Sequence, residues 1–152
     1  MNHAERAKSL FEQGYNCAQS VLGAFAEDVG LEPEEAFRLA SSFGGGMGGM
    51  REVCGTVSGM LMAAGLLYGY SDPSDRQGKI EQYERVRELS ERFRAEHGSI
   101  ICRELLGLGE HPQPKAPEER TADYYKKRPC GGLTASAAQI LEDYIGEHPV
   151  RK

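Results

Sequence analysis

The sequence predicts an all-α protein that folds as a single-domain, compact bundle of six to eight helices. Three observations favour this fold class. Along most of the chain, apolar residues recur at intervals of three and four, which places them on one face of a helix. No segment alternates apolar and polar residues as a half-buried strand does. The chain has 152 residues, which is enough to bury a core within one domain spanning residues 1–152.

The first two predicted helices are short and follow each other closely. The first covers residues 4–13. Asn16 is a favourable N-cap for the second, and Gln19, three residues later, completes a capping-box pattern. Because Cys17 and Val21 lie four residues apart, they share one face of this helix. We therefore expect Cys17 to point toward the core.

The next two helices flank a glycine-rich segment. One is predicted over residues 34–43, and residues 44–49, which include five glycines, follow it. The other is predicted over residues 54–68. Its small residues recur every four positions, at Gly55, Gly59 and Ala63. A stripe of this kind lets a neighbouring backbone approach closely, so we place this helix at the centre of the bundle.

A long amphipathic helix is predicted over residues 75–97, with one densely charged face. Gly98 is suited to end it, and Ser99 is a candidate N-cap for a following helix in which Cys102 is the third residue. Residues 109–117 contain three prolines and are predicted to form an irregular loop. Two further helices are predicted, a short one at 118–127 and a last one from residue 130 to about 145.

Charge and hydropathy argue against some classes of function. The formal net charge is −5, which disfavours nucleic acid or an anionic membrane as the main partner. The longest apolar stretch, residues 57–70, has 14 residues, whereas a membrane span requires roughly 20. The first residues are charged and lack the apolar segment of a secretory signal. We therefore expect a cytoplasmic protein that neither binds nucleic acid nor inserts into a membrane.

The candidate functional residues are four isolated cysteines, each near a predicted helix start: Cys17, Cys54, Cys102 and Cys130. A helix N-terminus carries partial positive charge and lowers the pKa of a thiol, which favours the thiolate that attacks disulfides and binds metals. Cytoplasmic thiols are kept reduced, so four of them indicate metal binding or redox cycling more than a permanent disulfide framework. The basic run 126–128 would also favour a thiolate at Cys130.

The cysteine pattern alone leaves several interpretations open. The intervals of 37, 48 and 28 residues match neither the paired cysteines of structural zinc sites nor the clustered ones of common ferredoxins. The four residues could bind an iron–sulfur cluster or a structural zinc ion, or pack as ordinary small hydrophobes. A thiol–disulfide protein needs only two of them, with Cys54 attacking and Cys17 resolving the mixed disulfide.

The glycine run contains a G-x-G-x-x-G pattern at Gly44, Gly46 and Gly49. That motif binds a dinucleotide when it follows a strand and opens a helix, whereas here it follows a helical segment. We therefore interpret the run as a close-packed connection that leads to Cys54. Its backbone N–H groups are candidate hydrogen-bond donors to thiolate or cluster sulfur.

The local sequence around the cysteines and the glycine run is distinctive: GYNCAQSVL at 14–22, FGGGMG at 43–48, CGTVSG at 54–59, CREL at 102–105 and the late Cys130. In these segments the chain resembles the C_GCAxxG_C_C family of redox-active proteins. Thr56 departs from the family pattern, which usually has Ala at this position, so the packing beside Cys54 is expected to differ.

The resemblance implies a small helical protein whose four cysteines act together. A related domain in a multihaem cytochrome looks like a two-iron iron–sulfur carrier. By that similarity, the expected ligands of a [2Fe–2S] cluster here are the four cysteines Cys17, Cys54, Cys102 and Cys130. We expect an unidentified redox protein as partner, and a homo-oligomer is compatible with the sequence. The alternatives remain a dithiol protein without a cofactor and a structural Cys₄ zinc protein.

Overall fold

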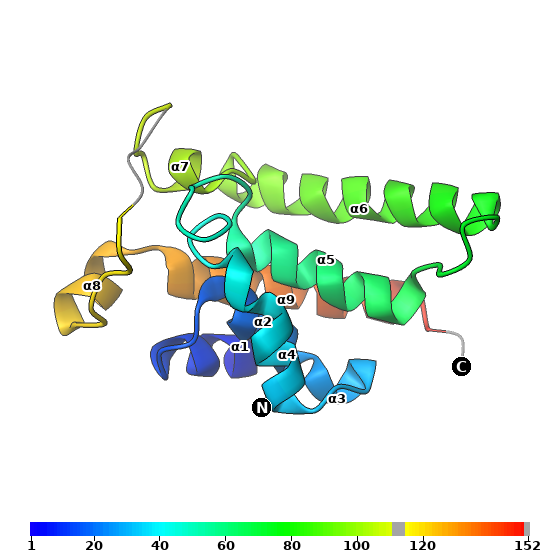
Figure 1. Ribbon diagram of the computed structural model, residues 1–152, viewed down its shortest axis with the longest axis horizontal. Coiled ribbons are helices and arrows are strands. Elements are labelled where there is room, and N and C mark those ends of the chain that lie inside the picture. The colour runs from blue at the N-terminus through cyan, green and yellow to red at the C-terminus, as the bar shows by residue number, and fades with distance from the viewer. Residues whose placement is uncertain (111–114, 151–152) are drawn as a thin grey trace.

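The computed structural model describes residues 1–110 and 115–150 and is built from helices (Figure 1). The helices in these ranges are α1 (His3–Glu12), α2 (Cys17–Ala24), α3 (Ala26–Val29), α4 (Pro33–Ala40), η1 (a 3₁₀ turn, Ser41–Phe43), α5 (Gly55–Tyr68), α6 (Arg76–His97), α7 (Cys102–Leu105), α8 (Ala122–Lys127) and α9 (Cys130–Glu147). The all-α prediction is confirmed. The count of α-helices in these ranges exceeds six to eight because α3 and α7 are single turns of four residues.

Local capping explains where the first two helices begin. Asn2 and Asn16 each accept a hydrogen bond from the backbone N–H three residues later, and the side chains at those positions bond back to the caps. The predicted capping box at Asn16 and Gln19 is therefore present, with bonds of 2.8 and 3.0 Å. It fixes Cys17 as the first residue of α2.

Helix α5 lies at the centre of the fold, as the glycine stripe predicts. It packs against α2, α6 and α9, and in Figure 1 α6 runs along one side of it while α2 and α4 lie on the other. A Cβ atom added at Gly59 would lie 2.7 Å from the carbonyl oxygen of Ala18, and one at Gly55 would lie 2.9 Å from that of Phe43. Glycine at these two positions is therefore what allows the backbones to meet.

The hydrophobic core is one cluster that joins most of the helices. Its largest fully buried side chains include Phe11, Phe25, Phe93, Leu22 and Met60. Helix α9 packs on α1, α2, α5 and α6, so the last helix completes the core formed by the first two and the central one. The predicted end of α6 is also confirmed, because Gly98 adopts a left-handed conformation with φ 87°.

A short antiparallel contact joins two segments that are far apart in the sequence. Val53 and Ile101 form an isolated β-bridge. Beside it, the N–H of Cys54 donates to the carbonyl of Ile100 at 2.7 Å, and the N–H of Cys102 donates to that of Glu52 at 2.6 Å. This pairing brings the start of α5 to the start of α7. It is too short to leave the alternating pattern by which strands are recognised.

Three predicted details of the second half are corrected. The N-cap of α7 is Ile101, so Cys102 is the first residue of that helix and not the third. Ser99 instead accepts a hydrogen bond from the N–H of Ile101 and donates one to Glu104. The short helix expected from residue 118 begins at Ala122, since the Thr121 side chain caps it.

The predicted loop over residues 109–117 lies partly outside the described residues, which omit 111–114; residues 109, 110 and 115–117 form no helix or strand. None of the helices described is long and apolar enough to cross a membrane.

Candidate functional site

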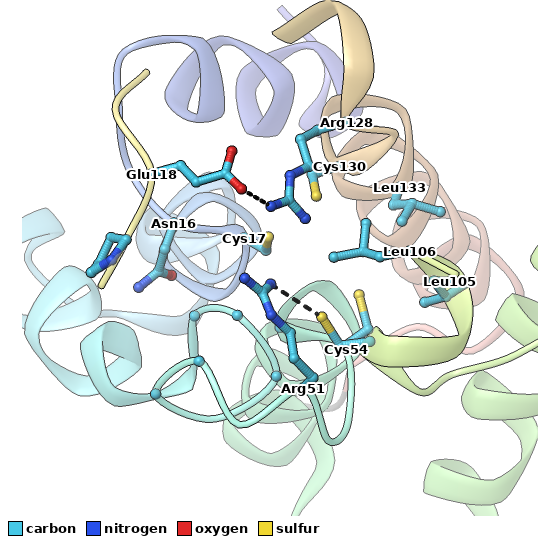
Figure 2. Close-up of a pocket in the computed structure, with 18 of the residues that line it drawn as sticks. Asn16, Cys17, Arg51, Cys54, Leu105, Leu106, Glu118, Arg128, Cys130 and Leu133 are labelled. Carbon is cyan, nitrogen blue, oxygen red and sulfur yellow. Dashed lines mark hydrogen bonds and ion pairs between the residues drawn. The ribbon is translucent and has the colours of Figure 1, made fainter. Parts of the chain in front are cut away.

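The four predicted cysteines line one cavity of about 290 Å³. They reach it from four places in the chain: the first residue of α2, the residue before α5, and the first residues of α7 and α9. Figure 2 shows Cys17, Cys54 and Cys130 around this common space. Cys54, Cys102 and Cys130 are buried, Cys17 is partly buried, and all four are free thiols. The packing of the helix starts against one another therefore buries the cysteines and also brings them to one cavity.

Cys54 and Cys102 form the first pair. The β-bridge between Val53 and Ile101 holds their backbones side by side. Each cysteine follows a bridged residue, so both side chains project from the face of the bridge opposite to that of Val53 and Ile101. Burial raises the pKa of Cys54, and the neighbouring Cys102 raises it further. The pair is thus fixed by backbone pairing and not by side-chain contacts alone.

Cys17 and Cys130 form the second pair, across the contact between α2 and α9. The interaction between the two neighbouring thiols is the largest influence on the pKa of both residues. It raises the pKa of Cys17 well above its usual range. Together with the charge of Arg128, and against the effect of burial, it lowers the pKa of Cys130 to about 7. In this pair Cys17 therefore keeps its proton, and Cys130 is the thiol that ionises more readily.

Helix starts do not favour the thiolate at every cysteine, so that expectation is wrong for three of the four. At Cys54 and Cys102 burial is the largest influence and raises the pKa. The N-terminal effect is present at Cys54, because its pKa is lowered by hydrogen bonds from the backbone of Thr56 and Val57, but burial exceeds it. The predicted help of the basic run to Cys130 is correct and comes from Arg128.

Two polar side chains contact the sulfur atoms of the first pair, and sequence reasoning did not find either contact. The guanidinium Nη1 of Arg51 lies 3.6 Å from Cys102 Sγ. The hydroxyl Oγ1 of Thr56 lies 3.1 Å from Cys54 Sγ, inside the core. The sequence marks Thr56 as a departure from the family pattern, but nothing in it distinguishes Arg51 from the other arginines.

Positive side chains surround the cysteines although the chain as a whole is acidic. The charged residues that line the cavity are Arg51, Lys115, Glu118, Arg120 and Arg128. Arg128 forms an ion pair with Glu118, which Figure 2 draws as a dashed line. Arg120 donates to the backbone carbonyls of Phe11 and Tyr15, at 3.0 Å each, and so ties the segment before α8 to the end of α1. The cavity therefore favours negative charge.

The glycine run forms one wall of this cavity, as a close-packed connection leading to Cys54. Gly46 has φ 68°, and a Cβ atom added there would lie 2.7 Å from Cys102 Cβ. Gly44 is equally constrained, because its added Cβ would lie 2.6 Å from the Asn16 side chain. Glycine at these two positions therefore leaves room for the cysteine site. No helix follows the run directly, as one does after a dinucleotide-binding loop.

The sequence profile of the family described as "Putative redox-active protein (C_GCAxxG_C_C)" matches residues 15–144, a range that contains all four cysteines. The chain belongs to this family. Membership agrees with the resemblance noted from the sequence and assigns the protein to a redox-active class.

One relative of this C_GCAxxG_C_C protein is described only as an uncharacterized protein, from Archaeoglobus fulgidus. The two chains are 34% identical over 91 residues, which cover 55% of this chain and 60% of the relative. The chain therefore spans about 60% of the length of the curated relative that it matches. No solved structure matches the chain.

The donor chemistry of the site suits a soft metal centre, since thiolates are the preferred ligands of zinc and iron–sulfur clusters. Within residues 1–110 and 115–150, however, no three Cys, His, Asp or Glu side chains converge on a point where a single ion would bind. The cysteines are arranged as two pairs around the cavity.

Proposed function

We propose that the protein binds a [2Fe–2S] cluster through Cys17, Cys54, Cys102 and Cys130 and transfers electrons to a redox partner. The single observation that carries this proposal is the convergence of the four thiols on one largely buried cavity as two pairs. A [2Fe–2S] cluster takes four thiolates, two on each iron. When bound, it supplies one-electron oxidation and reduction.

The residues of the cavity support this proposal in two further ways. The β-bridge holds Cys54 beside Cys102, and the packing of α2 against α9 holds Cys17 beside Cys130. The thiols are therefore positioned by the fold before a metal binds. Arginine side chains and the helix starts offset the negative charge that four thiolates bring. A structural zinc site fits less well, because one zinc ion requires its sulfur ligands at about 2.3 Å from a common point.

Anaerobic reconstitution with iron and sulfide tests the proposal. The expected result is a brown protein with visible absorption, two irons and two sulfides per chain, and a rhombic electron paramagnetic resonance signal after reduction. The variants C17S, C54S, C102S and C130S should each lose most of this absorption, and a variant with all four changes sets the background. A colourless product, or binding of one zinc ion in place of iron, would overturn the proposal.

A second candidate, thiol–disulfide exchange, is favoured by one specific feature: the neighbouring Cys17 thiol and the charge of Arg128 lower the pKa of Cys130 to about 7. The Cys130 thiolate would attack a disulfide of the partner, forming a mixed disulfide and releasing one partner thiolate. Cys17 would then attack Cys130 sulfur, closing a Cys17–Cys130 disulfide and releasing the second partner thiol. The sequence-based pairing of Cys54 with Cys17 remains a prediction for the same chemistry.

Mild oxidation distinguishes these pairings in the protein without a cluster. A disulfide lowers the mass by two hydrogens, and peptide mapping identifies its two cysteines. We expect C54S to keep a Cys17–Cys130 disulfide and C17S to lose it. If neither pairing forms with a disulfide substrate present, the exchange reaction is excluded.

A further inference from the structure

We propose that Arg51 is a positioning residue of the site: it supplies the positive charge beside Cys102 that favours the reduced form of the centre. The inference rests on the proposed function, in which Cys102 is a cluster ligand. It starts from the distance of 3.6 Å between Arg51 Nη1 and Cys102 Sγ. Arg51 also lines the cavity that holds the other three cysteines.

The backbone holds Arg51 in a conformation that most residues avoid. Its φ is 63°, in the left-handed region that favours glycine. Its N–H donates to the carbonyl of Gly45 at 3.0 Å, and its own carbonyl accepts from the N–H and the side chain of Arg103 at 3.1 and 3.3 Å. Strained residues fixed from several sides are concentrated at functional sites. The left-handed conformation of Arg51 turns the chain back toward the start of α7 after the glycine run.

Two arginines that line the cavity, Arg51 and Arg120, have no ion-pair partner among the described residues, and Arg120 uses its guanidinium to donate to backbone carbonyls. Arg128 pairs with Glu118, and Arg103 pairs with Glu52 at 2.9 Å. In the part of the chain that the structure describes, no carboxylate lies within ion-pair distance of Arg51. Its side-chain contact is with the sulfur of Cys102.

An uncompensated positive charge acts differently on the two oxidation states. Reduction adds one electron, supplied by the redox partner, and breaks no bond to the protein. The reduced centre is more negative by one charge, so a nearby cation stabilises it more than the oxidised centre. Hydrogen bonds to ligand sulfur act in the same direction. Arg51 should therefore raise the reduction potential.

The test compares four forms of the reconstituted protein by spectroelectrochemical titration. Arg51→Gln should shift the ratio of oxidised to reduced protein at a fixed potential by about tenfold or more toward the oxidised form, which is 59 mV for one electron. Arg51→Lys should restore most of this shift. Arg38→Gln is the matched control, because it removes the same charge from an exposed position on α4 that does not line the cavity. Equal potentials for R51Q and R38Q would overturn the inference.

A second readout needs no cluster. In the apoprotein at fixed pH, Cys102 is alkylated with anionic iodoacetate or neutral iodoacetamide, and the modified peptide is quantified by mass spectrometry. The rate with iodoacetate divided by the rate with iodoacetamide should fall about threefold or more in R51Q, because the positive charge that attracts the anionic reagent has been removed. An unchanged ratio would contradict the role of Arg51 even if wild-type protein bound no cluster, whereas failure of wild-type protein to bind one would overturn only the proposed function.

Folding of the variants is controlled by Arg51→Gly. Glycine adopts φ 63° without strain, so this variant removes the side chain while relieving the backbone. We expect R51G to match R51Q in both readouts and to unfold at a denaturant concentration no lower than wild type. If R51G kept the wild-type potential and rate ratio, the effect of R51Q would be structural and the inference would be wrong.

Discussion

Cys54 and Cys102 belong to different helices, yet two backbone hydrogen bonds flanking the Val53–Ile101 bridge hold their segments together, at 2.7 and 2.6 Å. The N–H of Cys54 donates in one of these bonds, and the N–H of Cys102 donates in the other. The first turn of a helix leaves its N–H groups without helical partners, so the bridge satisfies two such groups while it aligns the thiols. The wall behind Cys102 is Gly46, which can only be glycine at this distance.

Replacing Gly46 by Ala is therefore expected to disturb the site directly. The new Cβ would lie 2.7 Å from Cys102 Cβ and 2.6 Å from the backbone nitrogen of Glu52, at φ 68°. We expect a loss of about 1–3 kcal/mol in the free energy of unfolding, as for other residues forced into this region, together with a lower yield of reconstituted cluster. Urea denaturation followed by circular dichroism measures the first effect.

Gly132→Ala is the matched control for this change. Gly132 lies in the first turn of α9, two residues after Cys130, and a Cβ there would meet no atom within 4 Å. Ala is the better helix former, so G132A should be neutral or more stable by up to about 1 kcal/mol. If G46A were as stable as G132A and loaded cluster equally well, the close contact between Gly46 and Cys102 would not matter.

Much of the helical framework could be predicted because its causes are local. The capping box at Asn16, the glycine stop at Gly98 and the stripe of Gly55 and Gly59 are each written in a few neighbouring residues. The same reasoning placed each cysteine at a helix start. What it could not supply was the pairing of the cysteines, because that depends on a bridge of one residue pair and on the packing of α2 against α9.

The error about thiolates has a physical cause of the same kind. A helix start can be recognised from neighbouring residues, whereas burial depends on the whole fold. Three of the thiols are therefore held protonated by burial or by a neighbouring thiol, against the effect of the helix N-terminus. The role of Arg51 was hidden for a related reason, since it follows from a left-handed backbone at a residue that is not glycine.

Cys130 is predicted to be the most reactive thiol of the apoprotein at neutral pH. Its pKa is lowered to about 7, whereas those of the other three cysteines are raised. The rate of alkylation by iodoacetamide at Cys130 should therefore rise through pH 7 and level off about one unit above it. Peptide mapping at each pH gives the rate for every cysteine separately.

The variant C17S tests the cause of this reactivity, because the interaction with the Cys17 thiol is the largest effect that lowers the pKa of Cys130. Serine is a weaker acid than a thiol but still donates, so C17A is the stricter change. We expect C17A to move the alkylation midpoint of Cys130 to higher pH. A midpoint that stays near pH 7 in C17A would assign the low pKa to the charges of Arg128, Arg51 and Arg120.

Acid should weaken the attachment of α1 to α9 through His3 and Glu142. The His3 ring bonds Glu142 at 2.7 Å and Asp28 at 2.9 Å, and it stacks on Phe25. Hydrogen bonding to His3 lowers the pKa of Glu142 below its usual range. A carboxylate with a lowered folded-state pKa stabilises the protein fully above its unfolded pKa of about 4.3, and this stabilisation is lost as pH falls through the folded value.

Thermal unfolding between pH 6 and pH 3 measures this loss, and Glu142→Gln should make the unfolding temperature less dependent on pH across the acidic part of that range. Glu84→Gln is a suitable control, because Glu84 is exposed on α6 and, among the described residues, makes no side-chain hydrogen bond or ion pair. The same pH dependence in E142Q and E84Q would show that the His3–Glu142 contact has no part in acid stability.

Thr56 is predicted to tune Cys54 through its hydroxyl and not through its size. The hydroxyl lies 3.1 Å from Cys54 Sγ and is the largest of the effects that lower the pKa of that thiol. Thr56→Val keeps the shape of the side chain and removes the hydrogen bond. Cys54 should then be alkylated more slowly in the apoprotein, and the reconstituted centre should have a lower reduction potential, since hydrogen bonds to ligand sulfur stabilise the reduced form.

Thr134→Val separates this effect from the cost of placing an apolar group in the core. Thr134 is fully buried near the other cysteine pair, but its hydroxyl donates to the backbone carbonyl of Cys130 at 2.6 Å and not to sulfur. T134V should therefore leave the rate at Cys54 unchanged, while T56S should keep the wild-type rate by retaining the hydroxyl. If T56V and T134V gave the same Cys54 rate and the same potential, the hydroxyl of Thr56 would have only a packing role, and alanine at this position would serve the site equally well.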